Sequence, residues 1–128
     1  MSAREATMPT SKLQTTEADF MAQVIDLAHL YGWLVQHTRP AWTERGWRTP
    51  IQGDAGFLDL VLAHLGQQRV IFAEVKSERG RLSPAQQRWI EALKACGQEV
   101  EVWRPDDINR ITWLLQPQDH RRKLQEDK

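Results

Sequence analysis

Apolar residues recur at helical spacing in the first patterned stretch of the chain. They lie three or four residues apart, as on one face of a helix, at Phe20, Val24, Leu27, Ala28 and Tyr31. The hydroxyl of Thr16 offers an N-cap ahead of this stretch, and Gly32 marks its end. The pattern predicts a first helix that begins near Thr16 and ends at Gly32.

Four further stretches have the length and composition of strands, and they cover residues 33–38, 57–62, 70–76 and 99–103. Successive side chains of a strand point to opposite faces of its sheet. In the third stretch Glu74 and Lys76 therefore share one face, while Ile71, Ala73 and Val75 occupy the other. Residues 64–68 predict a turn that makes the second and third strands neighbours.

A second long helix is predicted after the third strand. Ser83 is a strong N-cap, Pro84 suits the first helical position, and Gln86 completes a capping box. The helix is expected to end at about Cys96, which should pack as a small hydrophobe, because Gly97 follows it.

A shorter helix is predicted at the end of the patterned region. Asp106 or Asp107 would cap it, and it would run through Leu115.

The connection between residues 39 and 54 is long for a small domain, and long connections are more often functional or mobile than structural. It holds Arg39, Arg45 and Arg48 together with Trp42 and Trp47. Arginine interleaved with tryptophan suits phosphate contact and base stacking. The alternative is that the Trp rings cover the edge of the core.

Charged side chains interrupt two of the apolar strands, where they are costly unless they are paired or bind a metal. With the second and third strands as neighbours, one face brings together Asp59, Glu74 and Lys76. Two converging carboxylates form an oxygen site suited to Mg²⁺ or Mn²⁺. A lysine beside them can position a metal-bound water or neutralise charge on a phosphate, as phosphodiester hydrolysis requires. The alternative is that Glu74 and Lys76 form a solvated strand end.

Three short blocks follow one another in the sequence: Gly56-x-x-Asp59, Glu74-x-Lys76 and Leu82-Ser83-Pro84-x-Gln86-x-x-Trp89. In this order and at these separations they resemble the VRR-NUC nucleases, a branch of the PD-(D/E)XK superfamily, over roughly residues 17–104. That family commonly has proline before the aspartate, where this chain has Leu58, so the approach to Asp59 is expected to differ.

The resemblance implies the roles of several residues. Asp59 and Glu74 look like ligands of Mg²⁺ or Mn²⁺, with the Val75 carbonyl as a third, and Lys76 looks like the active-site lysine. It also implies that the elements form an αβββαβ core, an α/β fold in which a small mixed sheet is flanked by helices.

Two further site residues rest on the resemblance and keep structural alternatives. Gln86 looks like the supporting polar residue of the second helix, but a capping box explains it equally. Glu17 resembles the first-helix acid of many relatives, but a first-turn acid also favours the helix dipole.

Length and charge limit the possibilities. At 128 residues the chain is expected to hold one nuclease domain over residues 15–116, between a disordered arm at 1–14 and a charged tail at 117–128. A net charge of zero argues against coating of nucleic acid by bulk positive charge, so DNA contacts must come from local patches. The single cysteine suits a cytoplasmic location, and neither a membrane span nor a signal peptide is expected.

These observations lead to the hypothesis of a metal-dependent DNA endonuclease. The contacts with DNA are assigned to Arg39, Arg45, Arg48 and Trp47. Small VRR-NUC proteins, often encoded by bacteriophages, resemble junction-resolving enzymes that act as symmetric dimers. A homodimer that cuts branched DNA, such as a Holliday junction or a flap, is therefore expected in a bacterium or an infected host. The alternatives are a module that binds branched DNA without cutting it and a scaffold that docks a protein partner.

Overall fold

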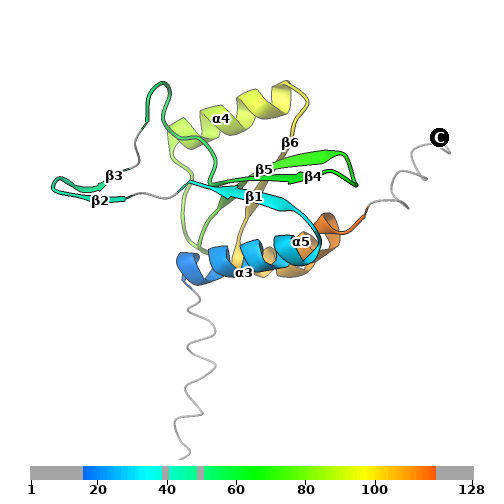
Figure 1. The fold of residues 1–128 in the computed structure, drawn as a ribbon. Coiled ribbons are helices and arrows are strands. Elements are labelled where there is room, and N and C mark those ends of the chain that lie inside the picture. Colours follow the sequence, from blue (N-terminus) through cyan, green and yellow to red (C-terminus); the bar gives the residue numbers. More distant parts are fainter. Residues whose placement is uncertain (1–15, 39–40, 49–50, 118–128) are drawn as a thin grey trace, which may run out of the picture.

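The computed structural model describes residues 16–38, 41–48 and 51–117 of the chain. A four-stranded sheet lies between α4 on one face and α3 and α5 on the other (Figure 1). The elements are α3 (Glu17–Leu30), β1 (Leu34–His37), β2 (Ala41–Thr43), β3 (Gly46–Arg48), β4 (Leu60–His64), β5 (Arg69–Val75), α4 (Pro84–Ala95), β6 (Glu99–Trp103), the 3₁₀ helix η1 (Pro105–Asp107) and α5 (Ile108–Leu115). The α/β fold with a small mixed sheet, predicted from the sequence, is confirmed.

The strand order β1-β4-β5-β6 places β5 inside the sheet. β4 pairs with both β1 and β5 in antiparallel fashion, whereas β5 and β6 are parallel and are joined through α4. The antiparallel register sets Leu60 opposite Ala73, so Asp59 comes next to Glu74 at the same end of the sheet.

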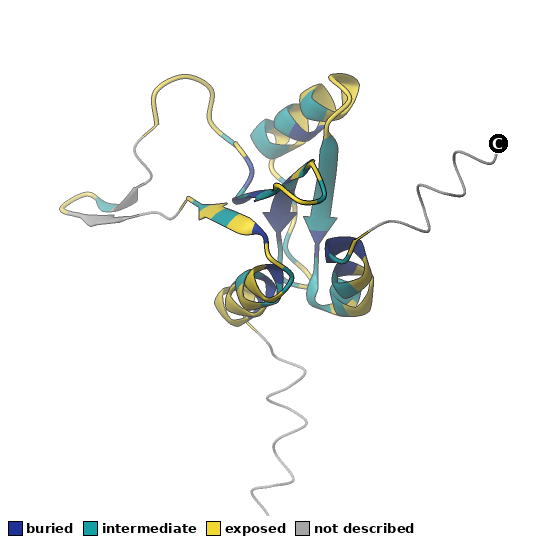
Figure 2. Cartoon of the chain, turned by 45° about the vertical axis from the view of Figure 1, so that its right-hand side comes forward, coloured by how far each residue is buried: buried dark blue, intermediate teal, exposed yellow. Residues whose placement is uncertain are grey.

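The two faces of β5 are buried against different helices. Ile71, Ala73 and Val75 are fully buried, as the alternation predicted, and they join the core that α3 and α5 cover. On the α4 face, Val70 is 41% exposed at one end of the strand, whereas Glu74 is 1% exposed at the other. Burial therefore increases along this face towards the carboxyl end of β5 (Figure 2).

The helix starts follow the predicted caps. The Thr16 hydroxyl accepts a hydrogen bond from the Asp19 N–H at 2.9 Å ahead of α3. Ser83 and Gln86 form a complete capping box at the start of α4. One local prediction was wrong, because Cys96 is exposed rather than packed. Asp107, one of the two predicted caps, is the N-cap residue of α5, but its carboxylate accepts the Arg104 N–H at 2.9 Å and makes no side-chain cap bond to α5.

The second strand begins later than the sequence predicted. The expected strand at residues 57–62 is β4 at Leu60–His64, and Phe57 and Asp59 lie in the preceding loop. The physical reason is local. Gly56 has φ +95°, which turns the chain, and the Val75 N–H donates to the Asp59 carboxylate instead of continuing the strand pairing.

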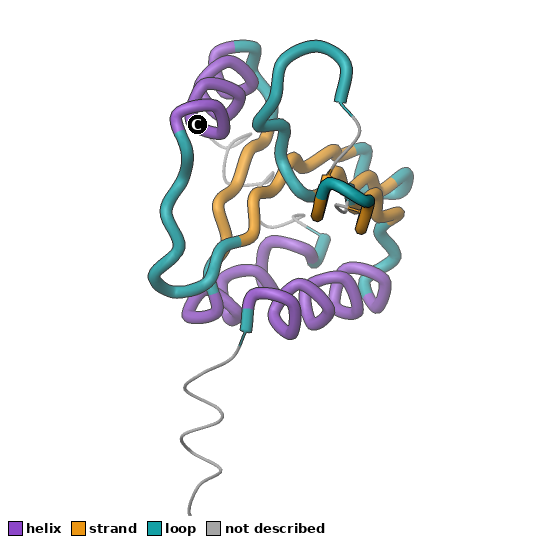
Figure 3. Tube along the Cα trace, turned by 90° about the vertical axis from the view of Figure 1, so that its left-hand side faces the viewer, coloured by secondary structure: helices purple, strands orange, loops and turns teal. Residues whose placement is uncertain are grey.

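The connection at residues 39–54 is not structureless, because β2 and β3 pair in it as an antiparallel hairpin. Trp42 lies opposite Trp47, and Gly46 takes φ +100° after the two-residue turn. Figure 3, viewed from the hairpin side, shows that the loop before β4 and the loop after β5 meet the sheet at this end. Arg39 and the predicted terminal segments at 1–14 and 118–128 lie outside the described residues. In the described part of the chain, no helix is long and apolar enough to cross a membrane.

The far end of the sheet is held by a polar cluster around Arg69. Its guanidinium makes two hydrogen bonds to the Glu99 carboxylate, at 3.2 and 2.6 Å, and one to the Leu114 carbonyl at 2.9 Å. It also lies 5.1 Å from the ring centroid of Trp33. The Trp33 Nε1–H donates to the Leu115 carbonyl at 2.8 Å, so the cluster binds the end of α5 to the sheet.

Replacement of Arg69 by alanine should destabilise the fold by about 2–4 kcal/mol, because Glu99 and a helix carbonyl then lose their partner. Urea unfolding measures this loss. Arg110→Ala is the matched control, because Arg110 also pairs with a β6 glutamate, Glu101, but is 48% exposed. Its loss should cost at most about 1 kcal/mol. Equal effects of the two substitutions would show that the Arg69 cluster does not hold the end of α5.

Candidate active site

The predicted site lies where β4 begins and β5 ends, beneath the first turn of α4. The sheet register brings Asp59 beside Glu74, and the capping box sets Gln86 over the same point. Lys76 directly follows β5. The structure therefore brings four of the predicted site residues together from three segments of the chain.

Glu74 is the one charged residue among the buried side chains of the described part of the chain, with 1% exposure. Its Oε2 accepts a hydrogen bond from Gln86 Nε2 at 2.9 Å and lies 3.6 Å from the Lys76 ammonium. Its Oε1 is buried and has no hydrogen-bond partner among the described residues. A buried carboxylate oxygen without a partner is unfavourable, so this atom indicates a ligand.

The protonation of Glu74 reflects that environment. Burial raises the pKa of Glu74 from its usual 4.5 to about 8, and the charge of Asp59 adds to the shift. The Lys76 ammonium opposes the shift but does not cancel it. At neutral pH the site therefore favours a proton on Glu74 unless another cation takes its place.

Asp59 is held by the backbone of both neighbouring strands. Its Oδ2 accepts the Val75 N–H at 2.9 Å, and its carbonyl accepts the Thr38 N–H at 3.2 Å. These bonds fix the carboxylate against the end of β5 while the residue stays partly exposed. The Val75 carbonyl, predicted as a third ligand, belongs to this same strand end.

Lys76 is not a solvated strand end, because its side chain is only 14% exposed. Its N–H donates to the Trp103 carbonyl at 2.9 Å, which extends the parallel pairing with β6 by one residue. Its Cδ lies 3.4 Å from the point that a Cβ on Gly80 would occupy. The following turn therefore packs over the lysine and restricts where the ammonium can move.

Gln86 makes both the capping bond and a hydrogen bond to the buried Glu74. Gln86 Oε1 accepts the Ser83 N–H at 2.9 Å within the capping box. Its Nε2 donates to Glu74 at 2.9 Å. The cap therefore fixes the amide in the orientation that serves the buried carboxylate.

Arg104 is a supporting residue that the sequence did not indicate. Its Nη1 donates to the carbonyls of Ser77 and Gly80, each at 2.7 Å. Glu78 accepts the Asp106 N–H at 2.7 Å, so the turn after Lys76 is bound to η1 at two points. Bonds to backbone carbonyls do not depend on the residue types that carry them, which is why no motif pointed to Arg104.

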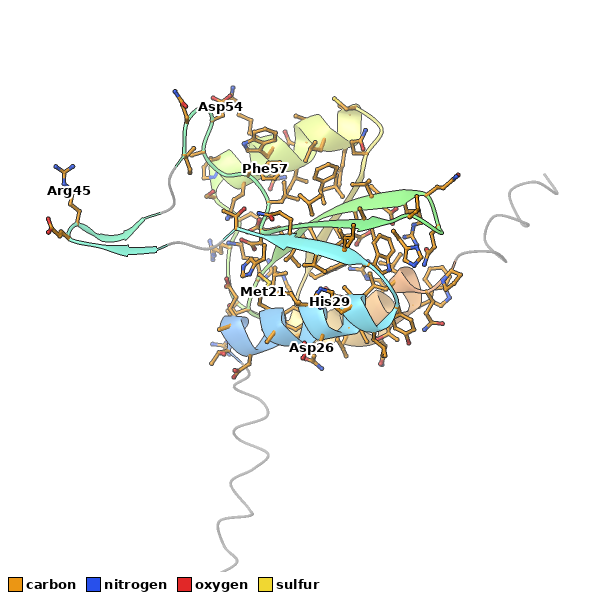
Figure 4. All side chains as sticks on the ribbon, viewed as in Figure 1. Met21, Asp26, His29, Arg45, Asp54 and Phe57 are labelled. Carbon is orange, nitrogen blue, oxygen red and sulfur yellow. The ribbon has the colours of Figure 1, made fainter. Side chains whose placement is uncertain are left out.

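Two other predicted site residues, Glu17 and Arg45, do not join this group. Glu17 is exposed in the first turn of α3, with no hydrogen bond or ion pair to another described side chain. Arg45 lies at the tip of the β2–β3 hairpin, away from the sheet (Figure 4). The structure describes only the backbone of Trp47 and Arg48.

The donor set fits a small hard cation. In the described residues, no cluster of three or more His, Cys, Asp or Glu side chains could enclose a metal. Mg²⁺ commonly keeps several waters and takes only one or two carboxylates from the protein, and Asp59 and the unpartnered Glu74 Oε1 could supply them.

The comparison with protein families agrees with this geometry. The VRR-NUC domain family matches residues 26–107, which include the two carboxylates, the lysine and Gln86. The chain belongs to the VRR-NUC family. A VRR-NUC domain indicates a nuclease, with DNA as the substrate class, and such domains typically use divalent metals. Searches among curated proteins and among solved structures gave no match.

Glu74→Gln should stabilise this VRR-NUC domain in metal-free buffer, increasingly as pH rises from 5 to 8. The raised pKa means that the stability contributed by protonated Glu74 is fully present below pH 4.5 and is lost as pH rises through about 8. Glutamine avoids that loss, which is at most about 1.4 kcal/mol per pH unit. The melting temperatures of the wild type and the variant, measured across this pH range, give the difference in stability. Mg²⁺ should raise the melting temperature of the wild type more than that of the variant.

Glu91→Gln is the control, because Glu91 is exposed on α4. Its melting temperature should follow the wild-type pH profile. If Glu74→Gln follows that profile as well, Glu74 is not held as a protonated, buried carboxyl group.

Proposed function

We propose that this VRR-NUC domain is a Mg²⁺- or Mn²⁺-dependent DNA endonuclease that hydrolyses phosphodiester bonds. Asp59, Glu74 and the Val75 carbonyl would hold the metal, and Lys76 and Gln86 would complete the catalytic centre. The observation that carries the proposal is the buried Glu74 Oε1, which no described protein group satisfies. The other oxygen, Oε2, accepts a hydrogen bond from Gln86. One oxygen of the carboxylate would therefore be positioned by Gln86 while the other binds the metal.

The chemistry requires a water oxygen to add to phosphorus and the bridging P–O bond to break, with a proton passing to the leaving oxygen. A bound divalent ion supplies charge neutralisation and a more acidic water. The Lys76 ammonium, confined beside Glu74, would orient the attacking water and offset negative charge on the phosphate. Gln86 would keep the Glu74 carboxylate in place through its 2.9 Å hydrogen bond. Glu17 is kept as a further candidate only because it resembles the first-helix acid of many relatives.

Branched DNA is the proposed substrate, and a homodimer is the proposed form. One chain offers a single cluster of this kind in its described part, so paired cuts on two strands require two copies related by symmetry. A bacterial or phage-infected cytoplasm is the proposed setting.

The β2–β3 hairpin is the proposed path for DNA into the site. It emerges beside the end of the sheet that carries Asp59, with Arg45 at its tip (Figure 4). Arg39, Arg48 and Trp47 belong to the same stretch of sequence. A chain with no net charge must draw DNA through such local contacts.

The proposal predicts cleavage that stops when the metal is removed and slows when the lysine is lost. Purified protein should cut linear, flapped or four-way DNA with Mg²⁺ or Mn²⁺, and a chelator should abolish the reaction. Lys76→Ala should lower the single-turnover rate by on the order of 10² or more with DNA affinity nearly unchanged, because a charge partner of the transition state is lost.

Lys94→Ala is the control, because Lys94 is exposed in the last turn of α4, at the other end of that helix. It should cut at the wild-type rate. Full activity in the chelator would rule out the metal mechanism. Metal-independent binding of branched DNA with no cleavage would instead favour a non-cutting binding module.

Arg45→Ala should weaken DNA binding and flatten its salt dependence by roughly one unit, because one phosphate contact is lost. The cleavage rate at saturating DNA should stay the same. Glu44→Ala, which removes one charge of the opposite sign from the same exposed turn, is the control and should bind DNA at least as tightly as the wild type. Anisotropy titrations at several salt concentrations measure both variants, and an unchanged salt slope for Arg45→Ala would remove the hairpin tip from the DNA path.

A further inference from the structure

A pocket of about 260 Å³ lies beside the active site, between α4 and the loop that precedes β4. It is lined by Asp54, Ala55, Ala85, Arg88, Trp89 and Ala92. None of these residues belongs to the proposed metal centre, although Ala85 directly precedes Gln86. The pocket and the carboxylates therefore lie on two sides of the same first turns of α4.

The pocket is formed by direct contacts between the loop and the helix. A Cβ on Gly56 would lie 2.5 Å from the Ala85 carbonyl carbon, so only glycine lets the loop come this close. The Trp89 Nε1–H donates to the Asp54 carbonyl at 3.3 Å, and the Phe57 ring meets the Trp89 ring at 4.9 Å between centroids with an angle of 82°. These contacts fix the walls without a ligand.

The lining has the chemistry of a site for a planar, polar-edged ring. The Trp89 N–H is already bonded to the loop, so the tryptophan and the three alanines offer mainly apolar surface. Asp54 and Arg88 add one acceptor and one donor. Both side chains are exposed, and neither makes a hydrogen bond or ion pair with another residue in the described part of the chain. Asp54 lies at the top of the loop above α4 in Figure 4.

We propose that this pocket receives one nucleobase of the DNA strand that is cut, unstacked from its neighbours. The inference rests on the proposed nuclease function and deepens it. The volume is below the roughly 300–1,000 Å³ of pockets for drug-sized ligands, so it suits one ring system. Arg88 lies two residues after Gln86, about 3 Å further along the helix axis, so the base belongs to a nucleotide close to the scissile phosphate.

The two polar side chains also give the pocket a preference among bases. The Asp54 carboxylate can accept from an exocyclic amino group, and the Arg88 guanidinium can donate to a ring nitrogen or carbonyl oxygen. Adenine, cytosine and guanine carry both features, whereas thymine has no amino group. Thymine at this position should therefore be cut most slowly, and Asp54→Asn should reduce that discrimination.

The decisive experiment combines removal of the base with filling of the pocket. Single abasic residues are placed in turn on either side of the cleaved bond of the branched DNA. One of them should raise the KM of the wild type by about five- to hundred-fold, as for loss of one stacked base. Ala92→Leu, which extends a side chain into the pocket, should raise the KM on intact DNA to a similar degree. Its effect should vanish on the sensitive abasic DNA, because the pocket then has no base to receive.

Ala95→Leu is the matched control, because Ala95 is also exposed on α4 but does not line the pocket. Leucine is a good helix former, so both variants should unfold at the wild-type urea concentration. Binding is measured in parallel in the Lys76→Ala background, so that it does not depend on turnover. Anisotropy should show the same pattern of abasic sensitivity there.

The outcomes separate the two proposals. Cleavage that is insensitive to Ala92→Leu and to every abasic position overturns the pocket and leaves the nuclease function intact. Pocket-dependent DNA binding without cleavage under any metal overturns the nuclease function and keeps the base site. If Ala92→Leu and base removal raise the KM additively, the two changes act at different places, and the proposal that this pocket receives the base is wrong.

Discussion

The burial of one carboxylate, Glu74, is the constraint on which the rest of this structure depends. A charged oxygen away from water requires a partner. Among the described residues, Glu74 Oε2 has a hydrogen bond from Gln86 and an ion pair with Lys76, whereas Oε1 has no hydrogen-bond partner. The apolar core could be built without this residue, because the opposite face of β5 is already fully buried. A fold that keeps such a group needs a proton or a cation to complete it. Without either, the buried carboxylate lowers the stability of the fold at this point.

The elements around Glu74 each limit its freedom in a different way. The loop before β4 supplies Asp59, whose carboxylate accepts the Val75 N–H, so its position is set by the backbone of β5. α4 supplies an amide that its own N-cap already orients. Arg104 fixes the turn that covers Lys76. Because each of these supports includes a hydrogen bond to the backbone, the side chains of the candidate site are arranged in the absence of any substrate.

Sequence patterns were sufficient where the determinants are local. The caps at Thr16 and Ser83 and the two-residue alternation through β5 depend on neighbouring residues, so they could be predicted. The start of β4 could not be predicted, because Asp59 ends the regular pairing through a bond to Val75, sixteen residues away. The role of Arg104 could not be predicted either, because its hydrogen-bond acceptors are backbone carbonyls on a distant turn. The β2–β3 hairpin was missed because its strands are only three residues long.

The first turns of α4 would connect the proposed metal site with the proposed base pocket. On one side Gln86 holds an oxygen of Glu74, and on the other Ala85 is in contact with Gly56, which brings the loop against the helix. A base held between that loop and the helix and a phosphate beside Glu74 would share one rigid support. Their separation would then be fixed by the backbone of the helix rather than by flexible side chains. In a chain without net charge, such a geometric relation can select where a strand is cut when long-range attraction cannot.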